Sequence, residues 1–370
     1  MTKKYFEHVG SFLRPEELKT ARAQFAAGEI SQEELTAIED RLITELVDKQ
    51  VAVGLEKITD GEFRRANWHV DFFWGFEGIE RSQYGEGLYF AGVETNDDSA
   101  IVTGKISFNK ATHPFIQHYR FIKQLADERG VEAKMTIPAP AQCLIELQRG
   151  SNLEKALAVY PNPADLAQDL AAAYRQAILA FYDEGARTIQ LDDCTWGAIM
   201  DDEFFQSVIK GVDKDFLREN FLRINNTAIV DLPEDLQINT HVCRGNYQST
   251  YLTSDPYTPV AETLFGRENA TAYFLEYDND RSGGFEPLAE FKNPDKVAVL
   301  GLVTTKDGKL EDKEQLIARI KEASQHIPLE QLWLATQCGF ASTEEGSILT
   351  DEDQWNKLKL VKEVIDEVWG

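Results

Sequence analysis

The run LQINTHVC, residues 236–243, ends a short apolar segment on a histidine and a cysteine. Three similar runs follow it along the chain: AYFLEYD (272–278), KVAVLGLV (296–303) and QLWLATQCG (331–339). Each is short, apolar and rich in β-branched or aromatic residues, as buried parallel strands are. A helical pattern at 311–324 separates the last two. Strands alternating with helices predict a parallel sheet made of βα units.

The same alternation continues toward the N-terminus. Further strand-like runs are HVGSF (8–12), KITDGE (57–62), AKMTIPAP (133–140) and RTIQLDD (187–193). Helical patterns cover 15–54, 164–184, 215–230 and 351–368, and Ser31 with Glu34 forms a capping box inside the first of them. Eight strands alternating with helices predict a single α/β domain over residues 1–370, a (β/α)8 TIM barrel.

The interval between the second and third strands is too long for one crossover. It contains the aromatic run NWHVDFFWGFEG, the strand-like run IVTGKISF and a helix at 114–129. We therefore predict that residues 63–130 form an insertion on the barrel rim after the second strand. Trp68 and the aromatic residues after it are expected mainly to pack, with a stacking role for a planar substrate as the alternative.

The composition excludes several classes of partner. With 38 basic and 63 acidic residues, the formal net charge is -25, which disfavours nucleic acid and anionic membranes. No apolar run is long enough to span a bilayer, and the N-terminal MTKKYFEHVGSF does not resemble a signal peptide. Four cysteines are too few for a disulfide scaffold, so we expect free or metal-bound thiols and a cytoplasmic location.

Three predicted strands end in metal-type ligands. His241 and Cys243 are two residues apart, so their side chains share one face of a strand. Glu276 ends the next strand, and Cys338 ends the strand two units beyond. Because the C-terminal ends of barrel strands meet at one mouth, we predict that these four residues bind Zn²⁺. The alternative is that both cysteines and the histidine are ordinary buried residues.

A second group of polar residues falls at other strand ends. Glu62 and Asp192 end the second and fourth strands and are predicted to bind an amino group from opposite sides. Asp60 and Asp193 are alternatively explained as helix caps or partners of nearby arginines. Ser11 follows the first strand, where its hydroxyl and the local backbone N–H groups are suited to a substrate carboxylate. Cys143, Cys194 and the remaining histidines have no assignable role in the sequence.

Taken in order, the motifs VGSFLRP, TDGEFRR, IQLDD, INTHVC, FLEYD and QCG resemble those of the catalytic barrel of cobalamin-independent methionine synthases. The resemblance spans almost the whole chain and corresponds to the C-terminal half of that two-barrel enzyme. Stand-alone, single-barrel members of the family are the most similar. The resemblance implies a methyltransferase of methionine biosynthesis, of the 5-methyltetrahydropteroyltriglutamate–homocysteine S-methyltransferase type.

The resemblance also implies roles for the residues singled out above. The four metal-type ligands would hold zinc, Glu62 and Asp192 would face the ammonium of homocysteine, and Ser11 its carboxylate. Two positions depart from the family. Lys306, in GLVTTKDG, stands near the place of a family histidine associated with proton transfer to the leaving group. TIPAPAQ lacks the family's aromatic contact for folate in the third strand.

These expectations combine into one mechanism. A free thiol is a weak nucleophile near neutral pH, and zinc deprotonates a thiol that binds to it. Glu276 is predicted to be the labile ligand that makes room for the substrate sulfur, because a carboxylate yields more easily than a thiolate. The bound thiolate would attack the methyl carbon of 5-methyltetrahydrofolate or its polyglutamate, with Lys306 or water as proton donor.

Three alternatives stay open at this point. The nearest is a zinc-dependent alkyltransferase that acts on another small thiol or uses another donor, such as a methyl-corrinoid or an epoxide. Tetrapyrrole decarboxylases use a similar barrel without metal, which leaves the four metal-type ligands unexplained. A non-enzymatic zinc-binding protein would leave the carboxylates beside the metal unexplained.

Overall fold

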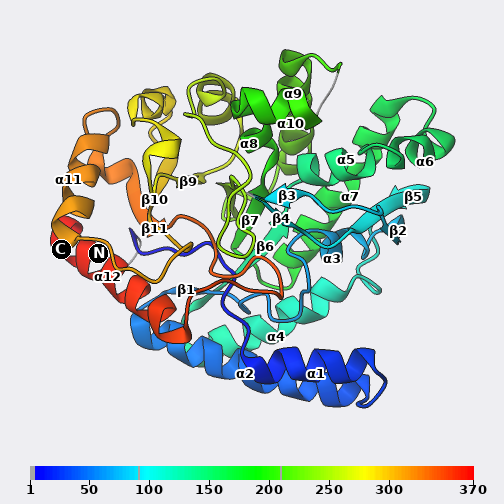
Figure 1. The fold of residues 1–370 in the computed structure, drawn as a ribbon, viewed down its shortest axis with the longest axis horizontal. Helices are drawn as coiled ribbons and strands as arrows, with labels where there is room; N and C mark the ends of the chain where they lie inside the picture. The colour runs from blue at the N-terminus through cyan, green and yellow to red at the C-terminus, as the bar shows by residue number, and fades with distance from the viewer. Residues whose placement is uncertain (1–4, 91, 209–210) are drawn as a thin grey trace.

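A curled parallel sheet surrounded by helices forms the body of the protein (Figure 1). The computed structural model describes residues 5–90, 92–208 and 211–370. Seven strands hydrogen-bond in the order β1-β6-β7-β8-β9-β10-β11, and every neighbouring pair is parallel. They are β1 (Lys57–Ile58), β6 (Glu132–Pro138), β7 (Thr188–Asp193), β8 (Gln237–Val242), β9 (Ala272–Glu276), β10 (Val297–Val303) and β11 (Leu332–Thr336).

Helices before, between and after these strands surround the sheet (Figure 1). They are α1 (Glu16–Ala26), α2 (Gln32–Val53), α4 (Pro114–Arg129), α5 (Pro140–Leu147), α6 (Asn152–Val159), α7 (Pro163–Asp183), α8 (Thr195–Met200), α9 (Asp202–Val208), α10 (Lys214–Ile229), α11 (Lys313–Ala323) and α12 (Asp351–Trp369). Short helical turns, η2 (Glu262–Arg267), η3 (Asp280–Ser282), η4 (Glu286–Glu290) and η5 (Leu329–Gln331), complete the loops. The Ser31–Glu34 capping box at the start of α2 is confirmed. No helix within the described residues is long and apolar enough to cross a membrane.

The prediction of an eighth strand at residues 8–12 is wrong. Phe6 forms a single parallel bridge to Leu334 of β11, and no ladder follows it. The reason is that side chains from other elements take the backbone carbonyls there. Lys134 Nζ donates to the carbonyl of His8, and Gln190 Nε2 donates to that of Val9 at 2.6 Å. The N-terminal segment therefore lies between β11 and β1 and fills the gap without closing an eight-stranded ladder.

Residues 63–130 contain the strands that lie outside the parallel sheet. After the short helix α3 (Val70–Phe73) come an antiparallel pair, β2 (Glu77–Gln83) with β5 (Asp98–Ser107), and a small hairpin, β3 (Tyr89–Phe90) with β4 (Val93–Glu94). The pair of β2 and β5 lies at the edge of the molecule, where β5 packs against α6 (Figure 1). The predicted helix at 114–129 is α4, which packs on β6 and α2 and so belongs to the helical layer.

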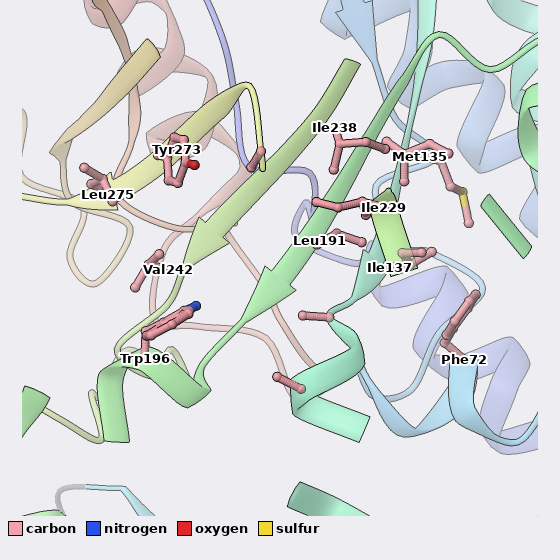
Figure 2. Close-up of a cluster of buried hydrophobic side chains, with 14 of the residues drawn as sticks. Phe72, Met135, Ile137, Leu191, Trp196, Ile229, Ile238, Val242, Tyr273 and Leu275 are labelled. Carbon is pink, nitrogen blue, oxygen red and sulfur yellow. The ribbon is translucent and has the colours of Figure 1, made fainter. Parts of the chain in front are cut away.

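Side-chain alternation along the strands separates two environments. On β9, Tyr273 and Leu275 join the large core between sheet and helices, whereas Ala272 and Phe274 join a smaller cluster with Val299 of β10. The same large core contains the labelled residues Met135, Ile137, Leu191, Ile238 and Val242 (Figure 2). Because successive side chains of a strand point to opposite faces, Glu276 shares the inner face with Ala272 and Phe274.

Candidate active site

A cavity of about 410 Å³ opens beside the C-terminal ends of β7 and β8. Its wall includes Asp192 at the end of β7 and His241 and Cys243 at the end of β8. Other lining residues come from the loops after β1 and β11 and from the segment 67–98. The cavity thus occupies the position at which parallel α/β barrels place their active sites.

Three of the four predicted metal ligands converge on one wall of this cavity. One ligand atom each from His241, Cys243 and Cys338 lies within 4.8 Å of the others. The two sulfur atoms are 3.8 Å apart, and His241 Nε2 is 3.5 Å from Cys338 Sγ. All three residues are buried. The strand positions explain this convergence, since the two β8 residues share a face and Cys338 follows β11 at the same end of the sheet.

The surroundings of Cys243 and Cys338 favour the protonated form of both thiols. The pKa of Cys243 is raised well above its ordinary value by contact with the Cys194 thiol and by burial. The pKa of Cys338 is raised well above its ordinary value by contact with the Cys243 thiol and by burial. A cation would reverse this shift, because a coordinating thiol is deprotonated outright. Cys194 thus lies against the cluster and lines the cavity, a position its spacing in the sequence did not reveal.

Glu276 lies next to the cluster but is turned away from it. Its Oε1 accepts a hydrogen bond of 2.6 Å from the backbone N–H of Arg244, directly after Cys243. Its Oε2 is buried and has no hydrogen-bond partner among the described residues. Arg281 Nη2 lies 3.9 Å from Glu276 Oε2. A fully buried carboxylate oxygen without a partner is costly, which is consistent with a site that holds a cation.

Glu62 and Asp192, the two carboxylates predicted to bind an amino group, both line the cavity. Asp192 is buried, and its pKa is raised well above the ordinary range by burial and next by the charge of Glu62. Its Oδ1 accepts from Gln190 Nε2 at 2.8 Å. Glu62 Oε1 accepts from the Thr136 hydroxyl at 2.9 Å, with Arg65 Nη1 at 3.4 Å, while its Oε2 has no partner among the described residues. Two such carboxylates are suited to share one ammonium group.

Ser11 also lines the cavity and is buried. Its hydroxyl lies against Gly339, where an added Cβ would come within 1.9 Å of the Ser11 oxygen. Asp60 and Asp193 each accept a local backbone hydrogen bond, but neither is the N-cap of a helix or forms an ion pair with an arginine among the described residues. Asp60 accepts from the N–H of Glu62 at 2.9 Å, and Asp193 accepts from the N–H of Thr195 at the start of α8.

Lys306 lies behind the loop that follows β8. Its Nζ donates to the carbonyl of Gly245 at 3.1 Å and to Asn246 Oδ1 at 3.2 Å. Asn246 lines the cavity, whereas Lys306 is not among the lining residues that the structure describes. The ammonium is therefore one residue removed from the cavity wall, on the side of the cysteines.

The cavity is also lined by Trp68, for which substrate stacking was the alternative prediction, and by His69 and Phe90, which the sequence analysis did not assign to the site. Trp68 and His69 stack on each other and line the cavity, and Phe90 of β3 lies against Tyr247. Burial and, next, the charge of Arg149 lower the pKa of His69 to about 3. Among the described lining residues, Arg149 is the one lysine or arginine. These contacts link the segment 67–98 to distant loops, so no local pattern could predict them.

The chain was compared with known protein families and with curated proteins. A family model described as the catalytic domain of cobalamin-independent synthase matches residues 7–352. The uncharacterized protein YxjG of Bacillus subtilis (strain 168) is 45% identical over 365 residues, which cover 98% of this chain and 94% of that protein. The methionine synthase of Sulfolobus acidocaldarius is 26% identical over 337 residues, which cover 90% of this chain and 84% of that protein.

A solved structure agrees with these matches. It is that of a Listeria monocytogenes protein provisionally named a vitamin-B12 independent methionine synthase. It superposes with a TM-score of 0.77 at 41% sequence identity, covering 99% of this chain and 98% of that one.

Proposed function

This chain belongs to the family of cobalamin-independent synthase catalytic domains, and from that premise we propose that it methylates homocysteine to methionine. The observation that carries the proposal is the sharing of one cavity by two groups. His241, Cys243 and Cys338 lie on one wall, and the carboxylates of Glu62 and Asp192 lie on another. The histidine and cysteines suit a metal ion that binds a substrate thiolate. The two carboxylates suit the ammonium of an amino acid whose side chain carries that thiolate.

We propose Zn²⁺ as the metal. Zinc bonds of about 2.3 Å to sulfur and about 2.1 Å to nitrogen put tetrahedral ligands about 3.8 Å (sulfur to sulfur) and about 3.6 Å (nitrogen to sulfur) apart. The observed separations are 3.8 Å between the two cysteine sulfurs and 3.5 Å between His241 Nε2 and Cys338 Sγ. Glu276, with its unpartnered buried oxygen, would complete the set. When bound, such an ion supplies charge that keeps a thiol ionised at neutral pH.

The chain's own residues would hold the acceptor. Glu62 and Asp192 would bind the homocysteine ammonium, which places its positive charge between two carboxylates and favours ionisation of Asp192. Ser11 would donate its hydroxyl to the substrate carboxylate. These contacts fix the two charged groups on the α-carbon, so that the side-chain sulfur is directed toward the cysteine wall. Positioning of this kind lowers the entropic part of the barrier for a displacement between two substrates.

The donor we propose is 5-methyltetrahydrofolate or its polyglutamate, against the wall formed by Trp68, His69 and Phe90. Lys306, directly or through a water, or water alone, would deliver a proton to the leaving nitrogen, and Asn246 Oδ1 would orient the Lys306 ammonium by accepting from it at 3.2 Å. We further propose that residues 1–370 act as one domain, and that the enzyme works in the cytoplasm, where thiols stay reduced.

One observation favours a second candidate. With Arg149 the one cationic lining residue described and Asp98 and Glu146 beside it on that wall, the cavity offers little to a polyanionic tail. The second candidate is therefore the same metal-assisted transfer of an alkyl group to a thiol, with another donor such as a methyl-corrinoid or an epoxide.

One experiment tests both candidates. Purified protein with its metal content measured is incubated with homocysteine or another small thiol, each combined in parallel with each donor, and the methionine or other thioether formed is quantified. Methionine formed from a methyl-folate supports the first candidate. Methionine or another thioether formed only with a different donor supports the second. No product with any donor or thiol, from protein that contains stoichiometric metal, would exclude both.

A further inference from the structure

Behind the cysteine wall, one guanidinium group lies between two carboxylates and hydrogen-bonds neither. Arg281 Nη2 is 3.9 Å from Glu276 Oε2 and 3.7 Å from Asp278 Oδ1. All three side chains are largely buried, with exposed fractions of 15% for Arg281, 0% for Glu276 and 1% for Asp278. Arg281 Nη2, Glu276 Oε2 and both Asp278 oxygens have no hydrogen-bond partner among the described residues.

The rest of the Arg281 side chain is anchored. Its Nη1 donates to the carbonyl of Thr253 at 3.2 Å, and its guanidinium lies 4.1 Å from the ring centre of Tyr251. The guanidinium is thus held in place while Nη2 stays free to pair with either acid. Because it holds several donors in one rigid plane, a small shift of either carboxylate is enough to form a bond.

Glu276 has a defined position away from the cysteines. The backbone N–H of Arg244 donates to its Oε1 at 2.6 Å, and its own N–H donates to the Tyr257 hydroxyl at 2.8 Å. One carboxylate oxygen is therefore satisfied in this position, and the other points toward Arg281 at a distance slightly beyond a hydrogen bond. A hydrogen bond from Arg281 Nη2 to Glu276 Oε2 would satisfy the second carboxylate oxygen in this position.

We propose that Arg281 and Asp278 are positioning residues that set how readily Glu276 leaves the metal. With Glu276 on the metal, Arg281 pairs with Asp278; when a substrate thiol takes the metal position, Arg281 pairs with Glu276 instead. The inference rests on the proposed function, because it needs a metal at His241, Cys243 and Cys338. Its physical basis is that a buried carboxylate left without a cation is strongly disfavoured, so its release requires a second cation close by.

The pair makes predictions of opposite sign. Arg281→Met removes the cation that receives Glu276, so the carboxylate stays on the metal and the thiol binds less well. Asp278→Asn removes the competitor for Arg281, so Glu276 is released more easily and the thiol binds better. A merely structural role for these residues would weaken binding in both variants.

The test uses the full chain with Co²⁺ in place of the native metal and follows the sulfur-to-cobalt absorption band during titration with L-homocysteine. We expect the dissociation constant to rise about tenfold in Arg281→Met and to fall several-fold, up to about tenfold, in Asp278→Asn. Without homocysteine, we expect Asp278→Asn to lose Co²⁺ to EDTA about tenfold faster. The matched control is Arg175→Met, which removes an arginine that bonds only a backbone carbonyl, that of Asp231. This control should leave both readouts unchanged.

Shifts in the same direction for both variants, or no shift in either, would overturn the inference. If Arg281→Met does not fold, the sign of the shift in Asp278→Asn decides alone. A homocysteine-dependent band in the unmodified protein, with no shift in the variants, would refute only the role of Arg281 and Asp278. The absence of any homocysteine-dependent change in this band in the unmodified protein would instead count against the proposed function.

Discussion

Asp192→Asn is expected to stabilise the protein while it weakens the binding of homocysteine. The pKa of Asp192 is raised well above its ordinary range by burial and by Glu62. A carboxyl with a raised pKa in the folded state reduces stability as the pH rises above its unfolded value of about 3.9, and the loss levels off above its folded pKa. The amide carries no charge to bury, and its oxygen still accepts from Gln190. We therefore expect a gain in unfolding free energy of roughly 1–3 kcal/mol at pH 7.5 that vanishes below about pH 4.

The same substitution removes one of the two charges proposed to bind the ammonium. Hydrogen bonds to charged groups contribute about 1.5–3 kcal/mol, so the affinity for homocysteine should fall about 10- to 150-fold. Isothermal titration with homocysteine gives the affinity, and urea unfolding at pH 7.5 and pH 3.5 gives the stability. The matched control is Asp193→Asn, because Asp193 is also buried but is not among the described residues that line the cavity, and its carboxylate bonds Thr195 and Asn225.

Asp193→Asn should leave the affinity within a factor of about three, and its gain in stability should be smaller than that of Asp192→Asn, because burial also raises the pKa of Asp193 but the amide loses the bond from Asn225. The reasoning would be refuted if Asp192→Asn lowered stability at pH 7.5, or if it bound homocysteine as well as the unmodified protein does.

Three further substitutions separate the metal, the proton donor and the core. Cys338→Ala should reduce the metal content measured by mass spectrometry well below one ion per chain, and full metal retention would remove Cys338 from the site. Lys306→Met should lower kcat with a methyl-folate donor about 10²-fold or more and leave homocysteine affinity unchanged, whereas an unchanged kcat would exclude Lys306 as the proton donor. Met135→Ala, in β6 and in the core of Figure 2, should cost about 2–5 kcal/mol of unfolding free energy without changing homocysteine affinity, because its side chain lies on the outer face of the sheet.

Much of the sheet and the cysteine wall could be predicted from the sequence. The strand β10, VAVLGLV, is apolar throughout because it is buried on both faces, and the runs that became β6 to β9 and β11 are short and flanked by helical patterns. The spacing of His241 and Cys243 fixes a shared face on any strand, and a parallel sheet brings the end of β11 to the same edge. Local pattern was sufficient for these features, since each depends on strand periodicity alone.

The features that were missed depend on contacts between distant residues. The segment 8–12 reads as a strand, yet the side chains of Lys134 and Gln190 occupy its carbonyls. Cys194 lies between the end of β7 and the start of α8. Its contact with the thiol of Cys243 depends on how the chain passes from the strand into this helix. The wall with Phe90 comes from a hairpin inserted far from β8 in the chain, and its contact with Tyr247 has no local signal.

The measurement that tests the central proposal most directly is methionine formation by one preparation before and after its metal is removed. The protein is assayed with homocysteine and the donor that supports turnover, stripped with a chelator, assayed again, and then supplied with one equivalent of Zn²⁺. We predict that activity disappears with the metal and returns with it, while circular dichroism shows that the stripped protein stays folded. Undiminished methionine formation by folded, metal-free protein would contradict the account.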